Sequence, residues 1–377
     1  MQLTSQSWVE IGRQALQRNV QTFRQLVGPE KAIMVVVKAN AYGHGLVPVA
    51  QTALAAGADW LAVFAPDEAF ALRQAGVETP ILVLGPTPAE LLARLAAEET
   101  HITVAGPEAV EAVLAAGVAG LQVHVKLETG THRQGFLATE LAAVKRMADA
   151  GHVVLAGAYT HFADIEDTTD HSFAMIQLER FKELVARLAD LGLRPRKLHT
   201  ACSAATLLFA DTYFDMVRVG ISLYGLWPSK ETLVSVKQSG QSPAQLRPVM
   251  TWKTRIAQTK SVPAGITVGY GRTYQTTRPS RLAVLPVGYA NGYDRALSNK
   301  AHVLVHGQRA GVCGRVMMNM MIVDITDIAA AAAGDEVVLL GNQGNDAISA
   351  ELMASWSDTI NYEVVSRVEP GAPRRLV

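Results

Sequence analysis

The chain has 377 residues, 49% of them hydrophobic and 18% charged, and its 34 basic residues balance its 34 acidic residues. This balance provides no electrostatic field for nucleic acid or an anionic membrane surface, so both partners are excluded and a small-molecule substrate is favoured. The opening residues lack the basic start and apolar centre of a signal peptide, and no apolar run reaches the roughly 18 residues of a membrane span, which predicts a cytoplasmic protein.

The two cysteines, Cys202 and Cys313, are too few for a disulfide framework, and their spacing indicates no metal site. We expect both thiols to be reduced and packed in the interior. Other side chains must then carry the chemistry.

From about residue 11 to residue 225, short apolar runs alternate with amphipathic stretches. The first such stretch, residues 13–28, places four apolar residues at helical spacing and ends on glycine. Residues 66–76 and 107–117 begin with proline and acidic residues and end on glycine, as helix caps and the helix dipole favour. These stretches are predicted to be helices that connect parallel strands.

The apolar runs between the helices are continuous rather than alternating, which indicates strands buried on both faces, as in a parallel sheet. There are eight of them: IMVVVKA, LAVF, ILVLG, HITVAG, VHVKLET, LAGAYTHF, RKLHTAC and MVRVG. Eight strand-helix units predict an α/β fold with a (β/α)₈ barrel of the TIM type, and a doubly wound open sheet is the alternative.

After residue 240 the pattern changes to strands separated by Gly, Pro and Asn, with little helical periodicity. This region is predicted to be a smaller, mostly β domain. The expected division is a barrel over residues 11–235 and a mostly β domain formed by residues 1–10 and 236–377.

Polar residues follow the apolar runs at the ends that a barrel directs towards its mouth, where active sites of this fold lie. They are Lys38, Lys126, Glu128, His161, His199, Ser203 and Arg218. Any one of them alone would more simply be a structural hydrogen-bonding group. Their presence at one end of the barrel favours a site.

Lys38 ends the first run, in VVVKANAYGHG. Burial favours its neutral amine, which makes it a candidate Schiff-base nucleophile, and a lysine that extends to solvent is the alternative. The loops TACSAAT and RVGIS offer Ser203 and the amide of Gly220 where such barrels bind phosphate. A reactive lysine and a phosphate site together indicate pyridoxal phosphate, although a sugar-phosphate aldolase would use the same two parts.

Nine motifs in order extend this interpretation over nearly the whole chain, from about Ser7 to Arg367. They are VVKANAYGHG, KLETGTHRQGF, YTHFADIED, HTACSAA, MVRVGISLYG, VGYGRTY, LPVGYANGYDR, GRVMMNMMIVDIT and TINYEVVSR. In this order they resemble the motifs of bacterial alanine racemases of the pyridoxal-phosphate barrel type. The lysine motif alone is less specific, because barrel-type decarboxylases and small pyridoxal-phosphate carrier proteins have a related one.

The resemblance implies an isomerase that interconverts L- and D-alanine and supplies D-alanine for peptidoglycan. Lys38 would bind the cofactor as a Schiff base and act as one catalytic base, and Tyr270 of the second subunit of a homodimer would act as the other. Two bases are needed because a proton leaves one face of Cα and another arrives on the opposite face. The cofactor supplies the electron sink.

The resemblance also assigns the remaining site residues. The cofactor residues it implies are Tyr42, His161, His199, Ser203, Arg218, Gly220, Ile221 and Tyr362. Arg133, Met318 and Asn319 would bind the substrate, and Tyr289 would line the entrance.

Two of these positions carry an electrostatic argument. Arg218 is implied to face the pyridine nitrogen, where a permanent positive charge disfavours protonation of the ring; a structural arginine paired with a carboxylate is the alternative. Lys126 lies in a strand buried on both faces, where an unpaired ammonium is costly. In much of the family this lysine is carbamylated and orients Arg133, whereas an ion pair with Glu128 would satisfy the same charge.

The sequence departs from the family pattern at Asn319 and Asn291, where aspartate is common, and at Thr131 and His132, where a methionine-containing segment is typical. These changes affect the expected substrate more than the cofactor. A serine racemase or a broad-specificity racemase is therefore an alternative, followed by a decarboxylase of related fold, for which Cys313 is the only distant candidate, and by a non-catalytic carrier.

Overall fold

Eight parallel strands between residues 32 and 219 form a nearly closed barrel in the computed structural model, which describes residues 6–240 and 242–377. From β2 to β8 each strand pairs with the next along the chain, and β2 also pairs with β9, in the order β8-β7-β6-β5-β4-β3-β2-β9, so the only unpaired neighbours among the described strands of the barrel are β8 and β9. The strands are β2 (Ala32–Val36), β3 (Trp60–Val63), β4 (Ile81–Val83), β5 (Thr100–Val104), β6 (Leu121–Lys126), β7 (Val153–Tyr159), β8 (Lys197–His199) and β9 (Met216–Val219). The predicted barrel is confirmed, and the open sheet is wrong.

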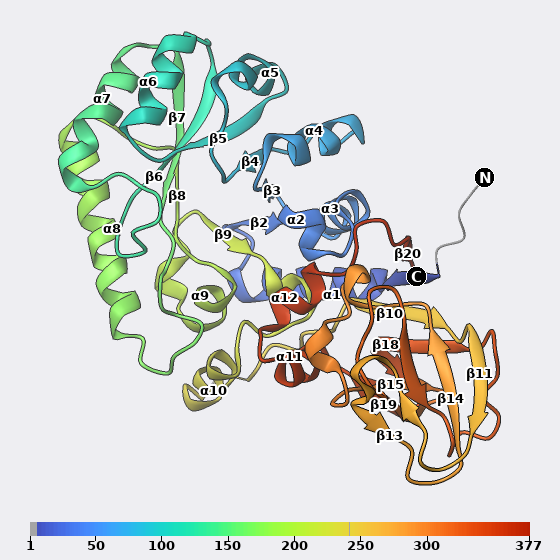
Figure 1. Cartoon of the computed structure of the whole chain (residues 1–377). Helices are drawn as coiled ribbons and strands as arrows, with labels where there is room; N and C mark the ends of the chain where they lie inside the picture. The colour runs from blue at the N-terminus through green and yellow to red at the C-terminus, as the bar shows by residue number, and fades with distance from the viewer. Residues whose placement is uncertain (1–5, 241) are drawn as a thin grey trace. The chain divides into compact units, whose positions relative to one another are not determined.

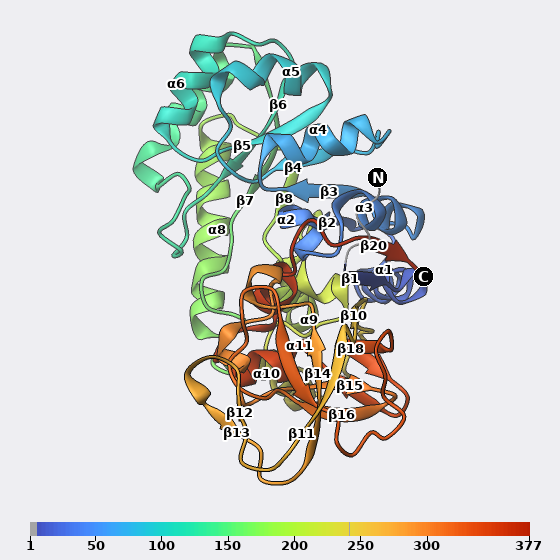
Figure 2. The same ribbon diagram turned by 45° about the vertical axis from the view of Figure 1, so that its right-hand side comes forward.

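Helices connect these strands, and Figure 1 shows α6, α7 and α8 on the outside of β5, β6 and β7. The helices of this part are α1 (Arg13–Val27), α2 (Lys38–Tyr42), α3 (Leu46–Ala55), α4 (Pro66–Gln74), α5 (Leu92–Ala97), α6 (Pro107–Ala116), α7 (Leu141–Asp149), α8 (Ser172–Asp190), α9 (Ser203–Leu208) and α10 (Lys230–Gln238). The long helix α8 runs beside β7 in Figure 2. The predicted proline starts of α4 and α6 are confirmed, and α6 ends on Gly117 in the left-handed conformation that glycine tolerates.

One local expectation was wrong. Strand β2 ends at Val36, two residues before Lys38, and Lys38 begins the short segment α2. Residues 39–42 all have positive φ between 52° and 55°, so the chain makes a left-handed helical turn directly after the lysine. Each non-glycine residue in this conformation costs about 1–2 kcal/mol, which sequence patterns for strands do not anticipate.

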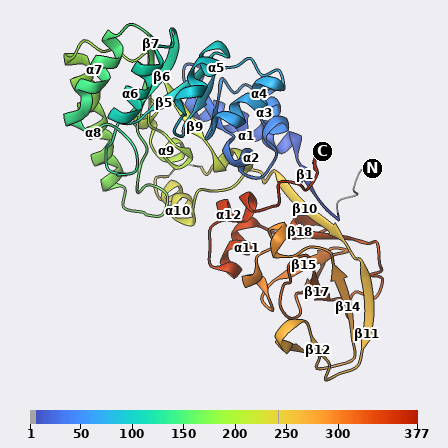
Figure 3. The same ribbon diagram turned by 45° about the horizontal axis from the view of Figure 1, so that its top comes forward.

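The C-terminal part contains a sheet in the order β16-β15-β18-β10-β1-β20, with β19 on β18, and a second sheet in the order β11-β14-β17. Strand β1 pairs antiparallel with β10 and parallel with β20, so both ends of the chain join one sheet. Figure 3 shows β10, β15 and β18 next to one another and β14 beside β17. The strands are β1 (Ser7–Ile11), β10 (Met250–Arg255), β11 (Gln258–Val262), β12 (Thr267–Val268), β13 (Tyr274–Gln275), β14 (Ser280–Leu285), β15 (His302–Val305), β16 (Gln308–Gly311), β17 (Met321–Asp324), β18 (Glu336–Gln343), β19 (Asp346–Ile348) and β20 (Arg374–Leu376), and the helices are α11 (Ala350–Ser357) and α12 (Asn361–Ser366).

The chain divides into two units, each with its own core. The barrel unit comprises residues 15–41 and 46–247, and the β unit comprises residues 1–14, 42–45 and 248–377. The border expected from the sequence lay at residues 235/236. No described helix is long and apolar enough to cross a membrane.

Candidate active site

The left-handed turn that carries Lys38 is held by two side chains of the barrel unit. Asn40 accepts a hydrogen bond from the amide of Leu46 through Oδ1 at 2.9 Å, and its own amide donates to Glu68 at 3.4 Å. Glu68 also accepts from the amide of Phe64 at 2.9 Å. These hydrogen bonds keep the strained backbone of the turn in place after the end of β2. Backbone strain of this kind is concentrated at functional sites.

The environment of Lys38 favours a neutral amine. Burial lowers the pKa of Lys38 below its ordinary value and the Arg133 guanidinium lowers it further, while Glu68 and Glu166 act in the opposite direction. A lysine with a lowered pKa presents the free base that imine formation and proton abstraction require.

Arg218 on β9 is 5% exposed, and no carboxylate among residues 6–240 and 242–377 forms an ion pair with it. Its Nη1 donates to Nδ1 and to the carbonyl oxygen of His199, both at 3.0 Å. Its Nη2 donates to the carbonyl oxygens of Thr160 at 2.8 Å and Thr200 at 3.0 Å, and lies 3.3 Å from Nδ1 of His161. The barrel thus binds both Nη groups, while no described residue accepts from the Nε–H, the fifth donor of the guanidinium.

The surroundings of the two histidines beside Arg218 favour neutral rings. Burial lowers the pKa of His161 and of His199 well below the ordinary value, and the positive charge of Arg218 adds to this effect in both. The ring of Tyr159 stacks on His199 with centroids 4.8 Å apart and planes 7° apart, and the Arg218 guanidinium lies 5.2 Å from the Tyr159 ring centroid. These contacts fix the guanidinium plane without cancelling its charge.

Ser203 and the start of the segment Ile221–Tyr224 bring hydrogen-bonding groups together. Ser203 Oγ accepts from the amide of Gly220 at 2.9 Å and from the amide of Ser222 at 3.5 Å. The Oγ of Ser222 is buried and has no hydrogen-bond partner among the described residues. The predicted residues Ser203, Gly220 and Ile221 therefore lie together. A cluster of hydroxyls and amides that includes an unsatisfied buried hydroxyl fits a phosphate.

Lys126 at the end of β6 is 5% exposed, and no ion pair or hydrogen bond to its ammonium is described. Burial, followed by the charges of Arg133 and Arg218, lowers the pKa of Lys126 to about 8. The carboxylate of Glu128 instead accepts from the amide of Gly130 at 2.6 Å. The expected alternative of a Lys126–Glu128 ion pair is therefore absent from the described contacts.

Two predicted cofactor residues lie in the β unit. The rings of Tyr42 and Tyr362 have centroids 6.2 Å apart at an angle of 47°. Gly43, which directly follows Tyr42, has a φ of +81°, and a Cβ at this position would overlap the carbonyl oxygen of Val365. The two tyrosines are thus brought together by a close approach of backbone that requires glycine.

A second group of predicted residues lines a cavity of about 500 Å³ in the β unit. Tyr270, Tyr289, Met318 and Asn319 are among its lining residues. Tyr270 is 70% exposed and Met318 is 57% exposed, which is unusual for large apolar side chains. The structure therefore gathers the predicted second base, the predicted entrance residue and two of the three predicted substrate residues on one open surface of the β unit, whereas the third, Arg133, belongs to the barrel unit.

Two of the departures from the family pattern, Asn319 and Asn291, are neighbours in this unit. Asn319 Nδ2 donates to Asn291 Oδ1 at 3.4 Å, and Asn291 Nδ2 donates to Glu369 at 2.9 Å. Asn291 Oδ1 also accepts from the amide of Gly288 at 3.0 Å. A neutral amide pair can make this contact, whereas two ionised carboxylates in the same positions would repel each other.

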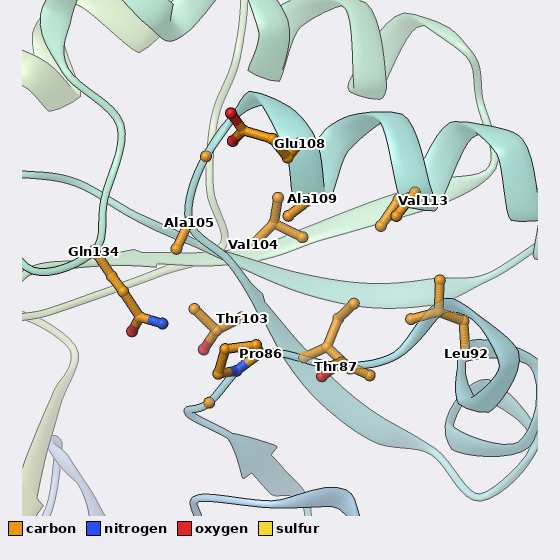
Figure 4. Close-up of a pocket in the computed structure, with 14 residues that line it drawn as sticks. Pro86, Thr87, Leu92, Thr103, Val104, Ala105, Glu108, Ala109, Val113 and Gln134 are labelled. Carbon is orange, nitrogen blue, oxygen red and sulfur yellow. The ribbon is translucent and has the colours of Figure 1, made fainter.

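A pocket of about 370 Å³ lies elsewhere in the barrel unit, between the loop after β4 and α6. Figure 4 shows Glu108 and Ala109 on the first turn of α6 above Val104, with Gln134 and Pro86 at the border. Its lining is mostly apolar, and no predicted site residue contributes to it. The candidate site therefore lies outside this pocket.

The sequence interpretation missed several residues of the site. Glu68 accepts a hydrogen bond from the turn that follows Lys38, and Tyr159 stacks on His199. Ser222 adds a second serine hydroxyl to that of Ser203 near Gly220. Ser222 could have been found, because it directly follows the predicted Ile221. Glu68 acts through hydrogen bonds to backbone amides and Tyr159 through ring stacking, and neither has a sequence signal.

Comparison with known proteins covers both units. The family models "Alanine racemase, N-terminal domain" and "Alanine racemase, C-terminal domain" match residues 11–228 and 249–376. The chain is 36% identical over 380 residues to alanine racemase of Leptospira interrogans, covering 100% of this chain and 97% of that protein, and 42% identical over 375 residues to alanine racemase of Desulfovibrio desulfuricans, covering 98% of each.

Solved structures agree with these relatives. The structure of alanine racemase from Bacillus anthracis with bound L-Ala-P superposes with a TM-score of 0.93 at 35% identity, covering 100% of this chain and 96% of that chain. The alanine racemase from Streptomyces lavendulae, a producer of D-cycloserine, gives 0.90 at 35% identity, covering 100% and 98%. With both domain models matched and relatives similar over its full length, this chain belongs to the alanine racemase family.

Proposed function

We propose that this protein is a pyridoxal-phosphate-dependent alanine racemase in which Lys38 and Tyr270 are the two catalytic bases. The observation that supports the proposal is the position of Lys38: an amine of lowered pKa, on a strained turn, follows the end of β2, which pairs with β9, the strand that carries Arg218. An electron-accepting cofactor is required at such an amine, because general acid-base catalysis alone contributes only about 10²–10⁴-fold.

The residues of the barrel fit pyridoxal phosphate. Lys38 would bind its aldehyde carbon, and Ser203, Gly220 and Ile221 would bind its phosphate, with Tyr42 and Tyr362 as the further phosphate residues that the family resemblance implies. Arg218 would direct its free Nε–H at the pyridine nitrogen. When bound, the cofactor withdraws electrons from Cα of the amino acid and so acidifies the proton there.

The chain's own residues then move protons and hold the substrate. On one face of Cα the amine of Lys38 would accept a proton and its ammonium would return one. On the other face the phenolate of Tyr270 would accept a proton and its phenol would return one. Arg133, supported by Met318 and Asn319, would bind the substrate carboxylate. Arg218 keeps a full positive charge beside the pyridine nitrogen, so that this nitrogen has no proton source from the arginine.

We propose a homodimer with shared sites, in which Tyr270 of one subunit serves the Lys38 of the other. The support is the exposure of Tyr270 and Met318 on the 500 Å³ cavity of the β unit, since a buried interface would cover this apolar surface. Sedimentation equilibrium should give a dimer, and substitutions on this cavity should reduce both association and activity.

We also propose that Lys126 is carbamylated. Its low exposure, its lowered pKa and the lack of a described carboxylate partner leave an amine that can react with carbon dioxide and become an anion facing Arg133. The decarboxylase alternative has little support, because Cys313 is 2% exposed and belongs to an apolar cluster with Val268 and Leu282.

The test follows L-alanine and L-serine in deuterated water with the purified holoenzyme. Racemisation of alanine with deuterium at Cα of both enantiomers supports the proposal, and carbon dioxide release or no exchange contradicts it. In Tyr270→Phe, Lys38 can still remove and return a proton on its own face, so one enantiomer should gain deuterium without inversion. Tyr274→Phe, a tyrosine of β13 with no assigned role, is the matched control and should racemise normally.

A further inference from the structure

Three histidines form a hydrogen-bonded chain through the barrel to Arg218. His101 Nδ1 lies 3.2 Å from His124 Nε2, and His124 Nδ1 lies 3.0 Å from His199 Nε2. His199 Nδ1 in turn accepts from Arg218 Nη1 at 3.0 Å. The chain begins near the start of β5, crosses β6 and β8, and ends on β9.

The direction of every hydrogen bond in this chain follows from its last member. A guanidinium only donates, so Nδ1 of His199 is an acceptor and its proton is on Nε2. That proton can only be donated to Nδ1 of His124, which places the proton of His124 on Nε2 as well. The same step assigns the proton of His101 to Nε2. All three imidazoles are therefore neutral and share one tautomer.

The surroundings agree with neutral rings. Burial lowers the pKa of His101 to about 4 and those of His124 and His199 well below the ordinary value. The charged groups that act on them are Arg73, Lys197 and Arg218, all cations that disfavour a further positive charge. If one imidazole of the chain were doubly protonated, its Nδ1–H would face the N–H donor of its neighbour, and that hydrogen bond would be lost.

Local backbone features make room for this arrangement. The pairing of β6 with β7 shifts register between Val123 and His124, which brings His124 opposite Gly157. A Cβ on Gly157 would overlap Nδ1 of His124. Trp60 packs edge-on against His101 and His124, with ring centroids 4.7 and 5.8 Å apart. The register shift, Gly157 and the ring of Trp60 together fix the position of the His124 imidazole. A side chain that only fills a core does not require three such features.

We propose that His124 and His101 are positioning residues that hold His199 in its Nε2–H tautomer and thereby fix the guanidinium of Arg218 for the racemase reaction. The inference rests on the proposed function. In this arrangement no imidazole nitrogen can deliver a proton towards Arg218, because each proton in the chain points away from it. Arg218 therefore keeps its orientation and its charge, and no imidazole of the histidine chain can transfer a proton to its guanidinium.

The first test measures the tautomers directly. In holoenzyme labelled with [¹⁵N]histidine, long-range ¹H–¹⁵N spectra should show His101, His124 and His199 each with a protonated Nε2 and a bare Nδ1. In His124→Phe, the His199 signals should shift towards a mixture of tautomers. His124→Asn, whose amide oxygen can accept near the position of Nδ1, should restore the Nε2–H form of His199. A proton on Nδ1 of His199 in the parent enzyme overturns the proposal.

The second test separates positioning from stability. Expressed per bound cofactor, kcat of His124→Phe should fall about tenfold, as with other groups that orient a site residue, and KM for alanine should change less than twofold. His101→Phe retains a ring against Trp60 and should show a smaller loss in the same direction. His152→Phe, a matched substitution of an exposed histidine, should change neither value.

The outcomes distinguish this inference from the proposed function. If the parent holoenzyme neither binds pyridoxal phosphate nor racemises alanine, the proposed function fails. If it racemises alanine but His124→Phe leaves the His199 tautomer or kcat unchanged, the positioning role fails alone. Loss of urea stability in His124→Phe with normal kcat per cofactor shows a purely structural histidine and likewise overturns it.

Discussion

Lys126 offers the most quantitative test of the site. Because burial and neighbouring cations lower its pKa from 10.5 to about 8, about one amine in ten is neutral at pH 7. The ordinary pKa would leave about one in 3,000, so the gain in reactive amine is about 300-fold. Only the neutral amine attacks carbon dioxide, forming the N–C bond and releasing a proton. The proposed carbamate anion would offset the charges of Arg133 and Arg218.

The assay is ¹³C NMR of the enzyme equilibrated with [¹³C]bicarbonate at pH 8, together with native mass spectrometry for one added carbon dioxide per chain. The signal should weaken as the pH is lowered below 8 and disappear in Lys126→Met. Lys145→Met, a change of an exposed lysine paired with Asp149, is the control and should keep the signal. Absence of the label in the parent enzyme, or its survival in Lys126→Met, would refute the reasoning.

The same substitution should change substrate binding. Without an anion at position 126, Arg133 loses a charge-assisted hydrogen bond, which is worth about 1.5–3 kcal/mol. We therefore expect KM for alanine to rise about tenfold or more in Lys126→Met, with a smaller effect on cofactor binding. An unchanged KM would show that Arg133 is oriented by other groups.

Three further predictions concern stability and reactivity. Gly43→Ala should lower the free energy of unfolding in urea by more than Gly76→Ala. Both glycines have a φ near +80°, where backbone strain alone costs about 1 kcal/mol, but only Gly43 lies against the backbone of Val365. Equal losses in the two variants would contradict the predicted overlap. His101 has a pKa lowered from 6.5 to about 4 in the folded state, so the unfolded chain binds more protons between these values and stability should fall by about 3 kcal/mol as the pH drops from 6.5 to 4. In His101→Gln this part of the pH dependence should be missing from urea titrations, and an identical profile would count against a neutral ring. Burial raises the pKa of Cys202 to about 12, so iodoacetamide at pH 8 should leave it unmodified in the native protein.

Much of the barrel could be predicted from the sequence because its strands are buried on both faces. Continuous apolar runs such as IMVVVKA and ILVLG have no polar alternation, and short amphipathic helices separate them. The exact end of the first strand could not be predicted. Among the first three residues of the turn only Asn40 is of a type enriched at positive φ, whereas Ala39 and Ala41 are not, and the turn is held by Glu68 on another helix.

The candidate site was only partly predictable. Strand ends identified Lys38, His161, His199 and Arg218 as a group, because all parallel strands of a barrel open at one mouth. His124 was not singled out, since one histidine in an apolar strand resembles core filling. The role that we propose for His124 depends on a register shift and on Gly157 of the next strand, neither of which is visible along β6.

The sequence by itself determined which residues are apolar, how often polar groups recur at strand ends, and which motifs follow one another. These features suffice to predict the barrel and to propose a lysine-bound cofactor. Only the tertiary structure decided protonation and orientation. Whether Lys126 has a carboxylate partner, whether Asn319 meets Asn291, and which nitrogen of His199 carries a proton depend on distances between strands that are far apart in the chain. Electrostatic and hydrogen-bond energies change steeply with such distances, whereas hydrophobic patterning depends only on the order of residues.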